Sequence, residues 1–186
     1  PDHTINEGFI DYWSARAQGG WGLLTVEATA IDPLGFATPR VPTLYDDRNI
    51  SGFKKLSDEV HKYGAKIAVQ LHHAGRQVSA MAIGQQPVSA SAIKCPLIRE
   101  VPRELTTEEV YQLIEQFGDA ALRARKAGID CVEIHGAHGY LIAQFMSPYS
   151  NKRIDEFGGS FENRMRFPIE IIKNIKRKAG NDYPVI

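Results

Sequence analysis

The sequence has few cysteines, no excess of charge of either sign and no long hydrophobic run. Its two cysteines cannot form a disulfide framework or a thiolate cluster. The formal net charge of +0 gives no indication of a nucleic acid or an anionic membrane as partner. No apolar stretch approaches the roughly 20 residues that cross a bilayer, and no signal peptide opens the chain. These absences favour a cytoplasmic globular protein.

The composition that remains is typical of a folded domain. Hydrophobic residues make up 43% and charged residues 24% of the chain, far from the composition of disordered proteins. The chain begins at Pro1 with what we interpret as the entry to a helix. It ends at residues 183–186 with a pattern that resembles the start of a buried strand. We therefore interpret residues 1–186 as one partial domain, an internal piece of a longer protein.

Short apolar runs of strand type alternate with longer helical patterns along the chain. The expected strands cover residues 22–27, 66–71, 131–134 and, at the end, 184–186. The expected helices cover residues 51–63, 107–127 and 164–178. Thr106 and Glu109 have the spacing of a capping box at the start of the second helix. This order predicts parallel strands joined by right-handed crossovers.

A doubly wound sheet and a (β/α)8 TIM barrel both satisfy this α/β order. Polar and aromatic residues follow each strand end, which favours the barrel, because barrel active sites lie at the carboxyl ends of the strands. No G-x-G-x-x-G loop follows any strand, which weakens the dinucleotide-binding alternative. Residues 77–105 contain several prolines and no clear period, and we expect an irregular excursion there.

Two imidazoles and a phenol follow the strand at residues 131–134, at His135, His138 and Tyr140. Imidazoles can donate hydrogen bonds to a carbonyl oxygen on which charge develops, and a phenol can donate a proton to a developing carbanion. A metal site that adds His72 or His73 is an alternative, although no carboxylate or cysteine is placed to complete it. Histidines that only stabilise a loop are another alternative.

Each of the other polar residues near the strand ends allows both a structural and a functional interpretation. Gln70 lies inside an apolar strand, where an amide needs either backbone partners or a polar ligand. Arg76 is a candidate ligand contact, but a salt bridge is the simpler interpretation. Glu27 and Glu133 could be taken for a pair of catalytic carboxylates, and the flanking pattern gives no geometry for such a pair.

Four segments resemble the Old Yellow Enzyme family in order and spacing. They are residues 22–30, 64–76, 128–141 and 144–167. The last segment contains S-P-x-x-N-x-R-x-D-x-F-G-G-S-x-E-N-R, which few other families join to an upstream H-G-A-H-G-Y. The resemblance covers nearly the whole chain, and it favours a functional over a purely structural role for the histidines.

The resemblance implies an FMN-binding TIM barrel of which this chain holds about the first half, from strand two to the start of strand five. The backbone at Ala28 would approach the flavin, and Gln70 would bond the isoalloxazine edge. His135 and His138 would bind the carbonyl oxygen of the substrate, with His135 also near the flavin, and Tyr140 would donate a proton. The implied enzyme uses NAD(P)H to reduce the C=C bond of an enone or enoyl thioester, as a homo-oligomer when complete.

Histidine at position 138, where some family members have asparagine, resembles the bacterial subgroup of 2,4-dienoyl-CoA and enoate reductases. Such relatives carry an iron–sulfur cluster and FAD in downstream regions. The family's first strand, an arginine expected just past Ile186 and the later strands that build the phosphate site are not in this chain. We therefore expect it alone to bind FMN weakly or not at all and to be inactive. The alternatives are a trimethylamine-type amine dehydrogenase and a non-catalytic barrel fragment that serves as a binding or scaffold module.

Overall fold

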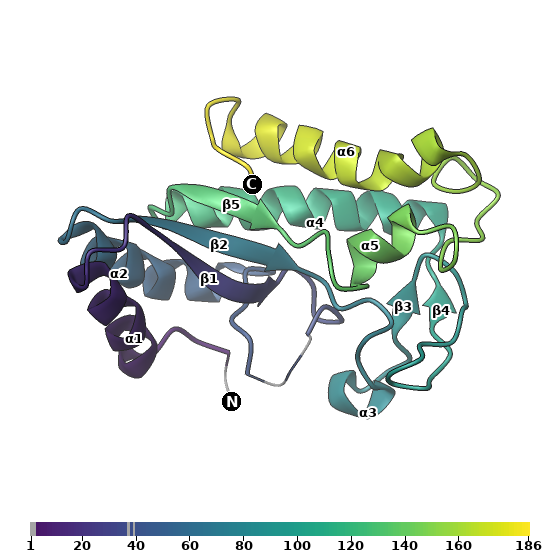
Figure 1. Ribbon diagram of the computed structural model, residues 1–186, viewed down its shortest axis with the longest axis horizontal. Coiled ribbons are helices and arrows are strands. Elements are labelled where there is room, and N and C mark those ends of the chain that lie inside the picture. Colours follow the sequence, from purple (N-terminus) through teal and green to yellow (C-terminus); the bar gives the residue numbers. More distant parts are fainter. Residues whose placement is uncertain (1–2, 37, 39) are drawn as a thin grey trace.

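A three-stranded parallel sheet forms the centre of the structure (Figure 1). The computed structural model describes residues 3–36, 38 and 40–186. β1 (Leu23–Ala30), β2 (Lys66–His72) and β5 (Cys131–Ile134) lie side by side in this order. A parallel bridge from Val132 to Val185 begins a fourth strand next to β5. The predicted α/β order is therefore confirmed as an open part of a TIM barrel.

Helices cover one face of this sheet. α1 (Glu7–Gln18) precedes β1, and α2 (Ile50–His61) connects β1 to β2 after the short 3-10 turn η1 (Asp47–Asn49). α4 (Thr107–Lys126) precedes β5, and α6 (Phe161–Ala179) packs along α4. In Figure 1, α2 and α4 lie behind the strands, while no helix crosses the near face of β1 and β2.

The alternation of side chains along each strand decides what reaches the uncovered face. In β2, Ile67, Val69 and Leu71 belong to the buried core that the helices share. Because successive side chains of a strand point to opposite faces, Gln70 and His72 point to the other side of the sheet. That side corresponds to the interior of the barrel. The helix-covered face carries the packing, and the uncovered face carries the polar residues.

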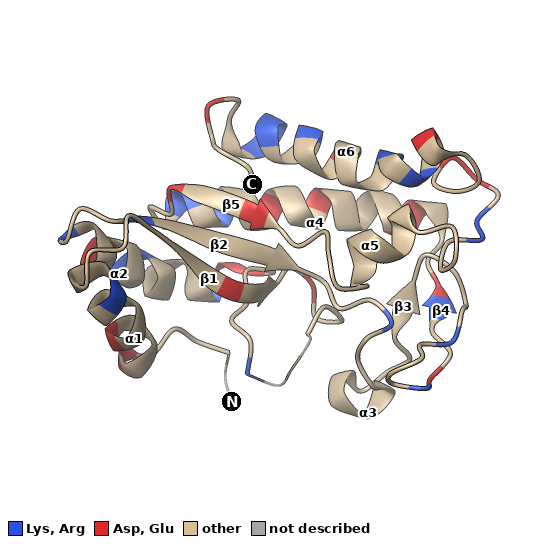
Figure 2. Ribbon diagram, viewed as in Figure 1, with Lys and Arg blue, Asp and Glu red and all other residues tan. Residues whose placement is uncertain are grey.

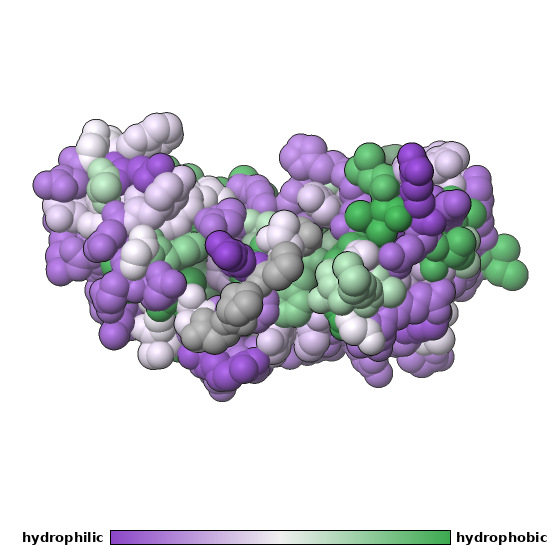
Figure 3. All heavy atoms as spheres, turned by 90° about the horizontal axis from the view of Figure 1, so that it is seen from below, coloured by the Kyte–Doolittle hydropathy of each residue, from purple (hydrophilic) through white to green (hydrophobic). Residues whose placement is uncertain are grey.

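The excursion between β2 and α4 has more regular structure than expected. It contains α3 (Ala80–Ile83) and a small parallel pair, β3 (Val88–Ser89) with β4 (Arg103–Glu104). The prediction of an irregular segment over residues 77–105 is wrong at these places. Because β3 and β4 are short and their partners lie far apart in the sequence, no local period shows their pairing. In Figure 3, apolar residues gather on the right-hand part, where the excursion lies.

Several predicted boundaries shift by a few residues. β1 continues to Ala30 rather than ending at residue 27, and α2 ends at His61 rather than at residue 63. α6 begins at residue 161 rather than 164, because the side chain of Ser160 caps it by accepting from the Asn163 N–H. The capping box at Thr106 is confirmed. The short helix α5 (Leu141–Met146) is not predicted by the sequence reading.

Arg153 fastens the excursion to the segment between α5 and α6. Its side chain is buried, with the residue only 6% exposed. Nη1 donates to the carbonyl oxygens of Ala90, directly after β3, and of Leu105, at the end of the excursion. Nε and Nη2 donate to the carboxylate of Asp155. We call this set of contacts the Arg153 clamp.

Charges of both signs are mixed over the surface. In Figure 2, α4 carries acidic residues from its first turn onward and basic residues in its last turn, and α6 carries residues of both signs. Within the part of the chain that the structure describes, no helix combines the length and the apolar character that crossing a bilayer requires.

Candidate active site

The predicted site residues gather at the carboxyl ends of the parallel strands. Ala28 lies near the end of β1, Gln70 near the end of β2, and His135 directly after β5. The register pairs Gln70 with Glu133, so that His72 and His135 follow on the same edge of the sheet. Side chains of residues that lie opposite each other on adjacent parallel strands point to the same face of the sheet. These side chains therefore share the uncovered face.

A β-bulge surrounds Ala28. Val26 pairs with Val69 and Thr29 pairs with Leu71, so β1 has one more residue than β2 between these two pairs. A bulge takes backbone groups out of the ladder and re-aims them, and bulges occur often beside active sites. The backbone at Ala28 is therefore placed to meet something other than its neighbouring strand.

The side-chain amide nitrogen of Gln70 has a hydrogen-bond partner within the sheet, and its amide oxygen has none among the described residues. Its Nε2 donates to Oε1 of Glu133, the residue opposite on β5. The side chain is half-buried on the uncovered face. Each of the two interpretations from the sequence is thus partly met. The amide nitrogen donates to a neighbouring side chain, and the amide oxygen can accept a hydrogen bond from a ligand.

His135 and His138 lie against each other. Nδ1 of His138 is 3.4 Å from Nε2 of His135, and the two rings meet edge to face with centroids 5.1 Å apart. The Ala137 N–H points at Nδ1 of His135 at 3.4 Å, so the His135 proton resides on Nε2, facing His138. Burial, and next the neighbouring imidazole, hold the pKa of His135 below its ordinary value. The imidazole of His135 is therefore favoured in its neutral form, and its Nε2 faces Nδ1 of His138.

Tyr140 completes the cluster from the start of α5. Its ring lies 4.9 Å from that of His135 and 4.4 Å from that of His72, in both cases edge to face. Such aromatic pairs fix ring orientation and stabilise by about 1 kcal/mol each. The structure thus brings together all three residues of the predicted H-x-x-H-x-Y set.

His72 is a member of the cluster that the sequence reading considered only as a metal ligand. Its ring is fully buried, and neither ring nitrogen has a hydrogen-bond partner among the described residues. Burial, followed by the charges of His135 and His73, lowers the pKa of His72 to about 3. Among residues 3–36, 38 and 40–186, no group of three histidine, cysteine, aspartate or glutamate side chains is arranged to hold a metal ion.

Two glutamines hold the loop that carries His138, a role that was not predicted from the sequence. Gln77 donates from Nε2 to the carbonyl oxygen of His138 at 2.7 Å, and Gln144 does so to that of Gly139 at 2.7 Å. Gln144 also accepts from the Arg76 N–H. The backbone of His138 adopts a φ of 56°, in the left-handed region. No local pattern distinguishes such glutamines from solvated ones.

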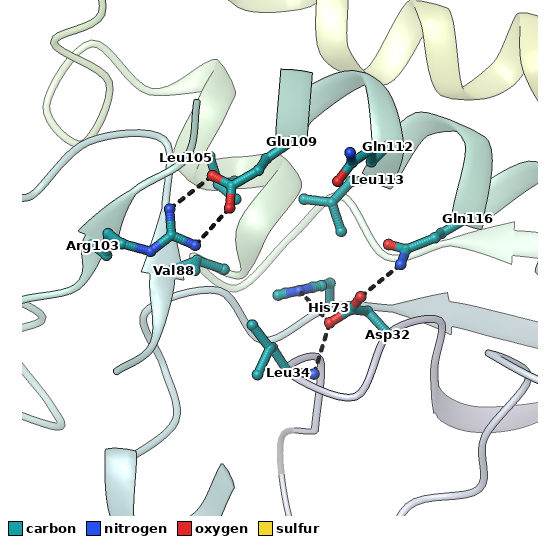
Figure 4. A pocket seen from close by; sticks show the side chains of 10 residues that line it. All are labelled: Asp32, Leu34, His73, Val88, Arg103, Leu105, Glu109, Gln112, Leu113 and Gln116. Carbon is teal, nitrogen blue, oxygen red and sulfur yellow. Dashed lines mark hydrogen bonds and ion pairs between the residues drawn. The ribbon is translucent and has the colours of Figure 1, made fainter. Parts of the chain in front are cut away.

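A separate polar cluster lies behind the site, around a cavity of about 90 Å³ (Figure 4). Nδ1 of His73 accepts from the Gly75 N–H, so the proton resides on Nε2, which lies 3.8 Å from Oδ1 of Asp32. Asp32 also accepts from the Leu34 N–H and from Nε2 of Gln116. His73, predicted from the sequence as a candidate metal ligand, lines this cavity, whereas none of the residues predicted to bind FMN or substrate does. The cluster connects the loop after β1 to the end of β2.

The buried histidines predict a loss of stability in mild acid. Burial lowers the pKa of His72 to about 3 and that of His73 to about 4, against an ordinary value of 6.5 in the unfolded chain. Between these values the unfolded state binds more protons, so the free energy of unfolding falls as the pH falls below 6.5. The expected slope is about 1 kcal/mol per pH unit for each histidine. Urea unfolding at pH 7.5 and about pH 5 measures it.

The variant His72→Phe keeps an aromatic ring against Tyr140 and removes one titrating group. It should show a shallower dependence of unfolding free energy on pH over the same window. A slope equal to that of the unchanged protein would contradict the assignment of a neutral buried imidazole at this position.

Comparisons with known proteins agree with this geometry. The model of the NADH:flavin oxidoreductase / NADH oxidase family matches residues 1–186. An NADH oxidase from Thermoanaerobacter brockii is 50% identical over 99% of this chain, which spans 29% of that protein. An Old Yellow Enzyme homologue from Zymomonas mobilis superposes with a TM-score of 0.92 at 33% identity, covering 99% of this chain and 54% of that one.

A further solved structure is a 2-naphthoyl-CoA reductase in complex with 2-naphthoyl-CoA. It superposes with a TM-score of 0.94 at 34% identity, covering 99% of this chain and 30% of that one. The chain therefore spans about half or less of the length of these relatives. With the family match over its whole length and the same fold, the chain belongs to the NADH:flavin oxidoreductase / NADH oxidase family, that of Old Yellow Enzyme.

Proposed function

We propose that this chain carries the substrate-activating part of an FMN-dependent enzyme that reduces the C=C bond of α,β-unsaturated carbonyl compounds with NAD(P)H. The family to which it belongs is that of NAD(P)H-dependent flavin oxidoreductases. The observation that carries the finer proposal is the paired imidazoles of His135 and His138 with Tyr140 in ring contact beside them. A pair of hydrogen-bond donors with a proton donor alongside suits a conjugated carbonyl group.

The uncovered face of the sheet fits a flavin. The bulge at Ala28 takes backbone groups out of the ladder, and Gln70 presents a free amide oxygen on the same face. Flavin rings have both donor and acceptor atoms along one edge, which an amide side chain and a backbone group can meet. We therefore assign Ala28, Gln70 and His135 to the binding of FMN, which when bound supplies a hydride for the β-carbon of the substrate.

The two imidazoles are positioned to hold one carbonyl oxygen. Their facing nitrogens are 3.4 Å apart, close enough for a single oxygen to accept a hydrogen bond from both once each bears a proton. His135 already has its proton on Nε2, and His138 needs the tautomer with a proton on Nδ1. Donors fixed in this way polarise the carbonyl and stabilise the enolate oxygen, a contribution worth about 10²–10³ in rate.

Tyr140 supplies the proton that the reaction requires. Reduction of the double bond adds a hydride at the β-carbon and a proton at the α-carbon. The phenol is held by ring contacts with His135 and His72, so its hydroxyl stays in one position as the substrate changes. The neighbouring rings exclude water from one side, which favours proton transfer from the phenol over transfer from solvent.

The substrate class follows from the activating pair and from one relative. The solved structure of a 2-naphthoyl-CoA reductase holds a thioester-linked conjugated carbonyl compound. We propose an enone or an enoyl thioester for the present chain, because both present a carbonyl oxygen conjugated with a C=C bond.

An anaerobic absorption experiment on the full-length protein tests this function. NADH or NADPH should bleach the flavin band near ~450 nm, and 2-cyclohexenone should restore it. With His138→Ala, bleaching should be unchanged and the return about 10²-fold slower, whereas the exposed His61→Ala should behave as the unchanged protein. Bleaching by an amine without NAD(P)H would contradict the proposal in favour of amine dehydrogenation, and absence of flavin would overturn the cofactor.

A further inference from the structure

We propose that Arg76 binds a carboxylate carried by the substrate itself, in a small pocket directly beside His138. This inference rests on the proposed function, and it narrows the substrate to conjugated carbonyl compounds that bear an anionic group. The pocket lies at the carboxyl end of β2, where the excursion begins.

Arg76 is a buried cation without a counter-charge. The residue is only 8% exposed, yet no carboxylate of the described residues comes within ion-pair distance of it. Its Nη1 donates to the carbonyl oxygens of Ile93 at 3.0 Å and Lys94 at 3.4 Å, and its Nε is buried without a partner. Burial of an unpaired charge is strongly unfavourable unless a partner completes it. The simpler sequence interpretation, a salt bridge, is thus not realised among these residues.

Arg153 shows what a satisfied buried arginine looks like in the same molecule. It is exposed to a similar degree, 6%, and its guanidinium binds Asp155 directly, with Glu104 at 3.6 Å. Both arginines also donate to backbone carbonyl oxygens of the excursion. The difference between them is the carboxylate, which Arg153 has within the chain and Arg76 does not.

Arg76 lines a pocket together with His138. The pocket has a volume of about 200 Å³, and His138 forms part of its wall. Gln77 adds a polar side, and the remaining walls include Cys95, Pro96 and Leu97. A ligand that places its carbonyl oxygen at His138 would share this pocket with apolar side chains and the guanidinium. This combination of lining residues suits a ligand with a short carbon skeleton that ends in an anionic group.

The position of Arg76 relative to the histidine loop is fixed by one side chain. Oε1 of Gln144 accepts from the Arg76 N–H at 3.2 Å, while Nε2 of Gln144 donates to the carbonyl oxygen of Gly139 at 2.7 Å. Gln144 itself is buried. The arginine and the loop of His138 are therefore held in one frame, so a ligand that reaches both needs no rearrangement of the chain.

A carboxylate is the anion that this arrangement favours. The planar guanidinium matches the two oxygens of a carboxylate, and charge-assisted hydrogen bonds of this kind are about twice as strong as neutral ones. Loss of such a bond should weaken binding by about tenfold to a hundredfold. A phosphate can also form a bidentate pair with a guanidinium, so the experiment includes an arm that separates the two.

Calorimetric titration of the full-length protein with two saturated analogues tests the proposal. Monomethyl succinate bears one carboxylate, and dimethyl succinate has the same skeleton without charge. The protein should bind the monoester at least about tenfold more tightly than the diester. Arg76→Gln should abolish this preference, Arg76→Lys should retain part of it, and Arg99→Gln, an exposed arginine of the excursion outside the pocket, should leave it unchanged.

Equal binding of the two esters by the unchanged protein would overturn the proposal, as would a preference that survives Arg76→Gln. The comparison of Arg76→Lys with the unchanged protein guards against misfolding of the glutamine variant. A selective rise in KM for NADPH over NADH in Arg76→Lys would assign the arginine to a cofactor phosphate and also overturn it. Because these titrations need no turnover, they stand apart from the failure or success of 2-cyclohexenone reduction.

Discussion

Replacement of Tyr140 by phenylalanine should lower the rate of substrate reduction by about 10²–10⁴-fold. The substitution keeps the ring that packs 4.4 Å from His72 and 4.9 Å from His135, and it removes only the hydroxyl that we propose as the proton donor. The α-carbon must then take its proton from water, which the ring contacts partly exclude. Stopped-flow measurement of the return of flavin absorbance, with 2-cyclohexenone added to the reduced full-length protein, gives this rate directly.

The same variant should be reduced by NAD(P)H at an unchanged rate, because no substrate proton is transferred in that step. Tyr63→Phe is the matched control, since Tyr63 is an exposed tyrosine that follows α2. A Tyr140→Phe protein that reduces the enone as fast as the control would remove the phenol from the proposed mechanism. Slowing of both half-reactions together would indicate instead that the hydroxyl positions the flavin.

Replacement of Arg153 by methionine should destabilise the protein by about 3–5 kcal/mol. The variant keeps apolar volume in a site where the residue is 6% exposed, and it removes every donor of the Arg153 clamp. The carbonyl oxygens of Ala90 and Leu105 lose their shared partner, and Asp155 keeps a charge without its cation. Chemical unfolding of the full-length protein, followed by circular dichroism, measures the change in unfolding free energy.

Arg177→Met serves as the control for this change. Arg177 also binds a carboxylate, that of Glu115 at 2.6 Å, but its side chain is 63% exposed. Exposed ion pairs contribute about 0–1 kcal/mol, so this variant should unfold almost as the unchanged protein does. In Arg153→Met, limited proteolysis should cut first within residues 77–105, where the clamp holds the excursion. Equal losses in the two variants would contradict a special role for the clamp.

The order of elements was predictable from the sequence because it depends on local patterns. The buried runs of β2 and β5 and the periodic face of α4 are visible in a few neighbouring residues. The capping box at Thr106 was predictable for the same reason, since both of its partners lie within one turn. The gathering of His135, His138 and Tyr140 also followed from their spacing after one strand.

Features that depend on distant partners could not be predicted in this way. The bulge at Ala28 is defined by the pairing of β1 with β2, and the residues of β1 alone do not indicate it. The contact of His72 with Tyr140 joins the ends of two different strands. Gln144 binds the backbone at Ala74 and Gly139, and a glutamine in a short helix gives no sign of such a task.

The segment that most clearly marked the family is chiefly structural. Asn151 donates from Nδ2 to the carbonyl oxygens of Phe145 and Phe157, both of which have fully buried rings. Arg153 holds the excursion, and Ser160 caps α6. A motif can therefore identify a family strongly while the proposed chemistry belongs to a different and shorter motif, residues 135–140.

The left-handed backbone at His138, with its φ of 56°, limits which donors can replace this side chain. Histidine, asparagine and aspartate tolerate this conformation better than other residues with a Cβ, and branched side chains tolerate it least. Replacement of His138 by asparagine would therefore stay within the set that the loop accepts. Threonine or valine at position 138 would have to distort the loop before its side chain could contact any ligand.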